Sequence, residues 1–264
     1  MVPESFWIVL AVIALLCSVG FYKFYYFLSV GYGLAIAGSG CTILILYGSS
    51  ASPITIIMCV LFIIYGLRLS SFLLIREFKS AAYRKKILNS DVVKKAPFFL
   101  KAAMWPCVSM MYISQISPVY YRAVNGGDCT VCAVAGGIIM LIGFIIETIA
   151  DKQKSTAKQL NPNRFCDIGL YKIVRCPNYF GETLFWTGSL ISGFGTLVGS
   201  QWILAIIGYC LILYVMLSGA KRLENRQNKT YGQDPEYEAY VNKTPILIPF
   251  IPLYHLQKCK FIVE

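Results

Sequence analysis

Three charged residues interrupt long apolar stretches. A charged residue in such a place is a candidate for catalysis or binding. The three are Arg68, Glu147 and Glu182. A charged side chain at membrane depth costs about 2.5–3.5 kcal/mol on insertion scales, so such residues usually mark a function. The alternative interpretation is structural: a side chain that reaches water at the end of a span, or an ion pair such as Arg68 with Glu182.

Polar neighbours accompany these charges at helical spacing. Tyr65, Arg68 and Phe72 stand at i, i+3 and i+7, on one face of a helix. Two further pairs are spaced four apart, Glu147 with Asp151 and Asn178 with Glu182. We expect the three charges to line one cavity that opens to the cytosol.

The composition indicates the elements that must position these residues. The chain has 264 residues, of which 57% are hydrophobic and 14% charged, whereas a soluble domain carries about 25% charged residues. A disordered chain, a coiled coil and a disulfide-rich secreted module are excluded by these figures. The net charge of +11 does not indicate nucleic acid, because the basic residues lie between apolar runs.

Apolar runs predict an all-α integral membrane protein with seven transmembrane helices in a single membrane domain over 1–264. Each run is long enough to span the bilayer. The runs are 5–22, 24–48, 53–75, 97–121, 131–150, 180–199 and 201–220, followed by a cytosolic tail at 221–264.

The basic residues predict the orientation. With seven spans, 21 of the 24 Lys and Arg residues fall on one side, and Arg122 alone falls on the other. The positive-inside rule therefore places the N-terminus outside or in a lumen and the C-terminus in the cytosol. We expect a monomer in the lipid bilayer of the endoplasmic reticulum or another endomembrane.

Two other segments have interpretations of their own. Residues 245–254 are apolar, but their three prolines prevent a spanning helix, so we expect them to lie against the bundle or the headgroups. Cys129 and Cys132 either form a disulfide or pack as small apolar side chains. With a single histidine in the chain, no metal site is expected.

The segment from Gly169 to Trp186, with the core Arg-Cys-Pro-Asn-Tyr-Phe-Gly-Glu, resembles the C-terminal signature of the steroid 5-alpha-reductase-like membrane family. A second stretch, from Tyr65 to Arg76, is similar to the third-helix motif of that family. The tail pattern follows the family as well, with Arg222-Leu-Glu-Asn-Arg226, Tyr231-Gly232, Tyr237, Tyr240 and Ile248-Pro249. Together these stretches cover about residues 60–250.

The resemblance implies a seven-helix bundle that binds NADPH from the cytosol and reduces an activated carbon–carbon double bond in a steroid-like or other lipidic substrate. The implied catalytic residues are Tyr65, on the substrate carbonyl, and Glu182, beside the nicotinamide. The implied cofactor-binding residues are Arg68, Phe72, Glu147, Asp151, Lys158, Arg175, Asn178, Tyr179, Arg222 and Arg226. With Arg164 and Lys172, the basic members form a rim suited to phosphate.

Two departures from the family pattern keep alternatives open. Segment 24–48 has no acidic residue, whereas animal steroid reductases use a glutamate there, which argues against a 3-oxo-4-ene steroid. Cys176 stands where related sequences often have histidine. The first alternative is an S-adenosylmethionine-dependent methyltransferase of the isoprenylcysteine type, whose related segment has that histidine. The second is a membrane scaffold without activity.

Overall fold

A computed structural model describes residues 3–79, 96–128, 130–257, 259 and 262. In these residues the regular secondary structure is helical, with no β-strand. The sequence-based prediction of an all-helical chain is confirmed to this extent. The chain divides into two compact units: unit 1 comprises residues 1–137 and 189–209, and unit 2 comprises residues 138–188 and 210–264.

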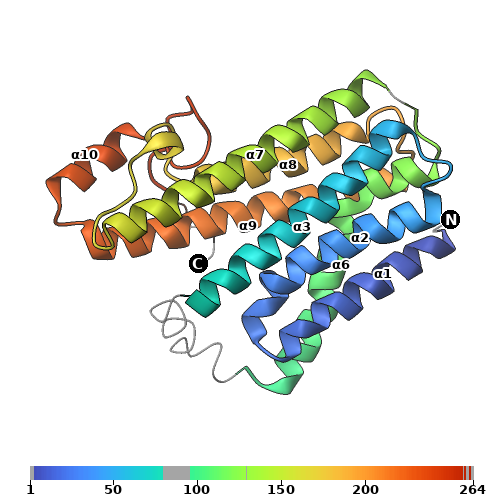
Figure 1. Cartoon of the computed structure of the whole chain (residues 1–264), viewed down its shortest axis with the longest axis horizontal. Helices are drawn as coiled ribbons and strands as arrows, with labels where there is room; N and C mark the ends of the chain where they lie inside the picture. Colours follow the sequence, from blue (N-terminus) through green and yellow to red (C-terminus); the bar gives the residue numbers. More distant parts are fainter. Residues whose placement is uncertain (1–2, 80–95, 129, 258, 260–261, 263–264) are drawn as a thin grey trace. The chain divides into compact units, whose positions relative to one another are not determined.

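The helices follow the apolar runs in chain order (Figure 1). Those wholly in unit 1 are α1 (Glu4–Cys17), η1 (Ser18–Phe21), η2 (Phe24–Leu28), α2 (Val30–Tyr47), α3 (Pro53–Lys79) and α6 (Phe98–Val124), of which η1 and η2 are 3₁₀ helices. Unit 2 alone contains the 3₁₀ helix η3 (Gly169–Lys172) and α10 (Pro235–Lys243). Each unit contains part of α7 (Val131–Leu160), α8 (Pro177–Ser192) and α9 (Ser200–Tyr231).

Five segments of the described chain are long and apolar enough to cross a membrane: Glu4–Phe21, Val30–Tyr47, Pro53–Lys79, Val131–Leu160 and Ser200–Tyr231. These segments make a bilayer the environment of the chain. Helices α6 and α8 are not among them; α6 contains Pro106 and Pro118, and α8 has 16 residues. Helices α7 and α9 continue past the predicted ends of their spans, to Leu160 and Tyr231.

In unit 1, α2 and α3 pack with their backbones in close contact. A Cβ atom added to Gly33 would lie 2.6 Å from the carbonyl oxygen of Gly66, and one added to Gly40 would lie 2.6 Å from that of Cys59. Small residues permit this approach, which favours helix association in lipid. The contact fixes the register of the two helices at Gly33 and Gly66.

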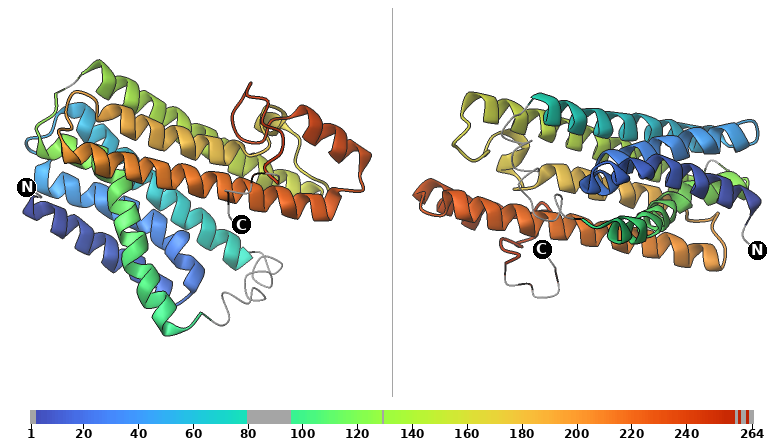
Figure 2. Two further views of the ribbon diagram at one scale, coloured as in Figure 1. Left: turned by 180° about the vertical axis from the view of Figure 1, so that it is seen from behind. Right: turned by 90° about the horizontal axis from the view of Figure 1, so that it is seen from below.

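Hydrogen bonds at the helix ends give the direction of the helices of unit 1. Ser5 Oγ lies 2.7 Å from the Tyr120 hydroxyl and accepts a 2.6 Å bond from the Tyr47 hydroxyl. Lys23 and Tyr26, between α1 and α2, both donate to the Glu77 carboxylate, at 2.5 and 2.7 Å. The start of α1 thus meets the ends of α2 and α6, so consecutive helices run antiparallel, and α1 and α2 lie side by side in both views of Figure 2.

Arg122, which the sequence places alone on the external side, lies in α6 and is fully buried. Its guanidinium donates to the Ser192 carbonyl at 2.8 Å, to Thr196 Oγ1 at 3.0 Å and to the Asp128 carbonyl. Ser192 is the last residue of α8, and the negative end of a helix dipole favours a cation. Arg122 is therefore a buried link between helix ends.

In unit 2, α7 and α8 meet at a second pair of glycines. A Cβ atom added to Gly143 would lie 2.5 Å from the Gly181 carbonyl oxygen, and one added to Gly181 would lie 2.6 Å from the Glu147 nitrogen. On α9, a Cβ atom added to Gly219 would lie 3.2–3.3 Å from the Tyr179 ring. Helix α8 is thus packed against both α7 and α9.

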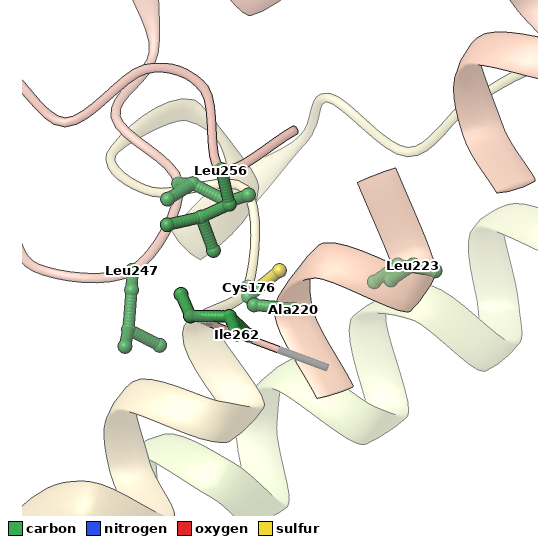
Figure 3. Packing of buried hydrophobic residues seen from close by; sticks show 7 residues of the cluster. Cys176, Ala220, Leu223, Leu247, Leu256 and Ile262 are labelled. Carbon is green, nitrogen blue, oxygen red and sulfur yellow. The ribbon is translucent and has the colours of Figure 1, made fainter. Parts of the chain in front are cut away.

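The tail of the chain packs against α9, as expected for residues 245–254. Ile246, Leu247, Leu256 and Ile262 form one buried cluster with Cys176, Ala220 and Leu223 (Figure 3). The Cys176 nitrogen donates to the Ile246 carbonyl at 2.9 Å. The residues that precede α8 are therefore held between α9 and the tail.

Candidate functional site

Tyr65 lies on α3, is fully buried and has a second tyrosine beside it. Its hydroxyl is 3.4 Å from that of Tyr32, on α2, and the two rings meet edge to face at 6.4 Å. Tyr32 also contacts the ring of Tyr112, at 5.0 Å, and the Tyr112 hydroxyl donates to the Phe27 carbonyl at 2.6 Å. Unit 1 therefore holds a buried pair of phenol groups between α2 and α3.

Sequence reasoning missed Tyr32. The sequence-based expectation for segment 24–48 concerned a carboxylic acid, which the segment lacks, and not a hydroxyl group. A signal was present, because Tyr32-Gly33 and Tyr65-Gly66 are the same dipeptide on two neighbouring helices. The two glycines form the α2–α3 contact, so the adjacent tyrosines are brought together.

Arg68 and Phe72 follow Tyr65 toward the end of α3. The Arg68 guanidinium lies over the Phe72 ring at 5.6 Å, and that of Arg76 lies over the same ring at 5.4 Å. Cation–π contacts of this kind hold guanidinium groups in place. Tyr65, Arg68 and Phe72 all lie in the continuous helix α3, as the prediction of a shared helix face requires.

In unit 2, α7 and α8 both contribute acidic residues to the candidate site. Glu147 is 2% exposed and Glu182 is 8% exposed. The Gly181 backbone contacts that of Glu147, so the residue before Glu182 lies directly against α7. Asp151 stands one turn beyond Glu147, and Lys154 follows at i+7 on the same face.

The start of α8 carries an unsatisfied acceptor and a cluster of charges. The side-chain oxygen of Asn178 is buried and has no hydrogen-bond partner among the described residues. The Tyr179 hydroxyl interacts electrostatically with Glu182, Arg222 and Arg226. Arg226 also acts on the ammonium group of Lys154. Charged residues of α8 and α9 are therefore near enough to Tyr179, at the start of α8, to act on it electrostatically.

Tyr171 adds a second buried polar atom to unit 2. Its hydroxyl has no hydrogen-bond partner in the part of the chain that the structure describes, and the Lys154 ammonium lies 5.8 Å from the centre of its ring. Burial, followed by the nearby Asp151 carboxylate, raises the pKa of Tyr171 above its usual range, so the phenol stays protonated. It can donate to a ligand as well as accept from one.

A family model for proteins of unknown function (DUF1295) matches residues 23–244, which include every candidate residue in both units. The chain belongs to the DUF1295 family. No curated protein and no solved structure matches the chain. The family description names no activity.

Two basic residues of this DUF1295 protein that sequence reasoning assigned to the cofactor contact the protein itself. Arg175 is 2% exposed, pairs with Glu224 at 3.0 Å and donates to the Tyr254 carbonyl. Lys158 donates to the carbonyls of Pro162 and Arg164, at 3.1 and 2.5 Å, and to the Tyr231 hydroxyl at 2.6 Å. Both hold the segments on either side of η3 in place.

Cys176, directly before α8 in this DUF1295 protein, is buried in an apolar cluster. Burial raises the pKa of Cys176 to about 11, so its thiol stays neutral and packs as an apolar group. Cys129 lies outside the described residues, so its pairing with Cys132 stays untested. In the described part of the chain, no three His, Cys, Asp or Glu side chains are placed to hold a metal ion.

Proposed function

We propose that this protein is an NADPH-dependent reductase of an activated carbon–carbon double bond in a steroid-like or other lipidic substrate. The observation that carries the proposal is at the N-terminus of α8. There the Asn178 oxygen is buried without a hydrogen-bond partner among the residues that the structure describes, and the next residue, Tyr179, interacts electrostatically with Glu182, Arg222 and Arg226. The resemblance of segment 169–186 to reductase signatures supports the same choice.

The residues of unit 2 fit a nicotinamide dinucleotide. Its phosphates need cations and N–H donors, which Arg222, Arg226, Lys154 and the helix N-terminus supply. Its hydroxyl and carboxamide groups need buried partners, which the Asn178 oxygen and the Tyr171 hydroxyl offer. When bound, the cofactor supplies a hydride for the substrate carbon.

The resemblance assigns the substrate carbonyl to Tyr65, and we propose that role for it here. Hydride addition to an alkene conjugated with a carbonyl builds negative charge on the carbonyl oxygen, which a hydrogen-bond donor stabilises. The buried Tyr65 hydroxyl provides that donor, and the Tyr32 hydroxyl, 3.4 Å away, provides a second polar contact in place of the missing carboxylic acid. Glu182 is the second candidate donor.

Nucleotide-dependent stability tests the proposal. In detergent, NADPH at 100 times its Kd should stabilise the protein by about 2.7 kcal/mol, and Asn178→Ala should weaken NADPH binding by about 1–3 kcal/mol because a buried hydrogen bond is lost. Thermal unfolding with NADPH or S-adenosylmethionine is the measurement. Asn242→Ala, an exposed position on α10, is the matched control.

The outcomes separate the proposed function from its alternatives. Stabilisation by S-adenosylmethionine alone would establish the methyltransferase interpretation, and stabilisation by neither compound would favour a scaffold. Identical NADPH binding by the wild type and Asn178→Ala would show that the nucleotide site lies elsewhere.

The proposal includes seven spans, with α6 and α8 crossing alongside the five candidate spans. The N-terminus is then external or lumenal and the C-terminus cytosolic, in the endoplasmic reticulum or another endomembrane. The 21 basic residues on one side support this orientation. A glycosylation site appended to the N-terminus should be used, and one appended to the C-terminus should stay unmodified; the reverse pattern would overturn the orientation and the cytosolic cofactor site.

A further inference from the structure

The tail segment 245–256 has a buried face and an exposed face. The Ile246 nitrogen donates to the Leu253 carbonyl at 2.8 Å and closes a loop between them. Ile246 and Leu247, together with Leu256 beyond the loop, face the cluster on α9 and are at most 3% exposed. The buried residues hold the loop against α9, whereas the tip of the loop takes no part in this packing.

The tip of the loop is apolar and turned away from the protein. Ile248 is 38% exposed, Phe250 96% and Ile251 49%. No charged residue occurs between Thr244 and His255. The tip therefore offers a contiguous apolar surface to its surroundings.

Phe250 contributes almost nothing to the fold that holds it. Its backbone has φ 65°, a left-handed conformation that is uncommon for a bulky residue. A turn with proline before a positive φ ordinarily has glycine or asparagine at that position. The phenyl ring is almost wholly exposed, so it is available to surroundings outside the chain.

The contacts of the tail with α9 set the level of the loop in the membrane. Helix α9 has 32 residues, about 48 Å at 1.5 Å per residue, whereas the hydrocarbon core is about 30 Å thick. From Ser200, the first charges of α9 are Lys221 and Arg222.

The tail is attached at that level. Lys221 Nζ donates to the carbonyls of Cys259 and Ile262, at 3.1 and 2.9 Å, and the Leu256 nitrogen donates to Glu224 at 2.8 Å. The loop thus belongs to the part of unit 2 where α9 leaves the hydrocarbon.

We propose that residues 248–251 are an interfacial anchor that inserts Ile248, Phe250 and Ile251 among the headgroups and upper acyl chains of the bilayer that α9 crosses. Apolar surface with aromatic residues at its edge suits this zone, and Tyr254 stands at the polar edge of the loop. The anchor is independent of the proposed catalytic function, because it depends only on unit 2 and on the membrane setting of α9.

Photo-crosslinking in a bilayer tests the anchor. The full chain carries p-benzoylphenylalanine in place of Phe250, in nanodiscs of phosphatidylcholine and phosphatidylserine, and mass spectrometry identifies the adducts. Glu238, exposed on α10, carries the same group in the matched control. We expect lipid adducts at position 250 in several-fold excess over position 238; equal yields, or adducts mainly with a second copy of the chain, would overturn the proposal.

A second variant separates lipid contact from internal packing. Phe250→Gly removes the ring and accepts the positive φ without strain, so Tm in detergent should be unchanged or raised. In nanodiscs, hydrogen exchange at backbone amides of 246–256 should be faster in the variant than in the wild type. An equal increase in detergent would show that the protein alone holds the loop and would overturn the anchor.

Discussion

Tyr65→Phe should lower single-turnover hydride transfer by roughly 10²–10³-fold, the cost typical of one oxyanion donor. The substitution removes a single hydroxyl group from a fully buried side chain and leaves the ring in its contact with Tyr32. NADPH affinity should barely change, because the lost interaction belongs to the transition state. The measurement is the rate of NADPH oxidation at saturating cofactor on an identified lipidic substrate.

Two further variants make the Tyr65 result specific. Tyr120→Phe also removes a buried hydroxyl from unit 1, but that hydroxyl contacts Ser5 at the start of α1, so the rate should stay near wild type. Tyr32→Phe should lower the rate less than Tyr65→Phe, since Tyr32 supports the donor. Wild-type turnover by Tyr65→Phe would leave Tyr65 a packing residue and Glu182 the candidate donor.

The positions of the helices could be predicted because a long apolar run is a local signal. Glycines that permit close approach, such as Gly33 and Gly66, are visible in the sequence, but their pairing depends on two helices folding against each other. Tyr32 was missed for this reason. The sequence showed a tyrosine in an apolar segment, which packing explains equally well.

The partners of the basic residues could not be predicted, because they come from distant parts of the chain. Arg175 looked like a member of a phosphate-binding rim, yet its carboxylate partner, Glu224, is on α9, and its carbonyl partner, Tyr254, is in the tail. Arg122 looked like an external loop charge, yet it binds the carbonyl of Ser192, at the end of α8, and that of Asp128, between α6 and α7. Counting charges gives a preferred side of the membrane, but it does not distinguish a binding residue from a structural one.

The Arg175–Glu224 pair leads to the largest expected change in stability. Glu224→Ala should cost about 3–5 kcal/mol, because removing one partner leaves the other charge buried and uncompensated. The side chains are 2% and 0% exposed, and the second Glu224 oxygen also accepts from the Leu256 nitrogen at 2.8 Å. The variant therefore loses the ion pair and one of the hydrogen bonds that attach the tail. Denaturant unfolding of the full chain in detergent is the measurement.

An exposed ion pair in the same unit provides the control. Arg164 pairs with Glu236 at 2.6 Å, but these side chains are 41% and 67% exposed, so Glu236→Ala should leave the unfolding free energy nearly unchanged. Replacing both buried partners, as Arg175→Met with Glu224→Leu, should recover most of the stability lost in Glu224→Ala. Equal small losses in Glu224→Ala and Glu236→Ala would contradict a buried structural pair. The fold of the double variant no longer depends on the charge of Arg175. Its affinity for NADPH therefore tests the cofactor-binding role that the resemblance implies for Arg175.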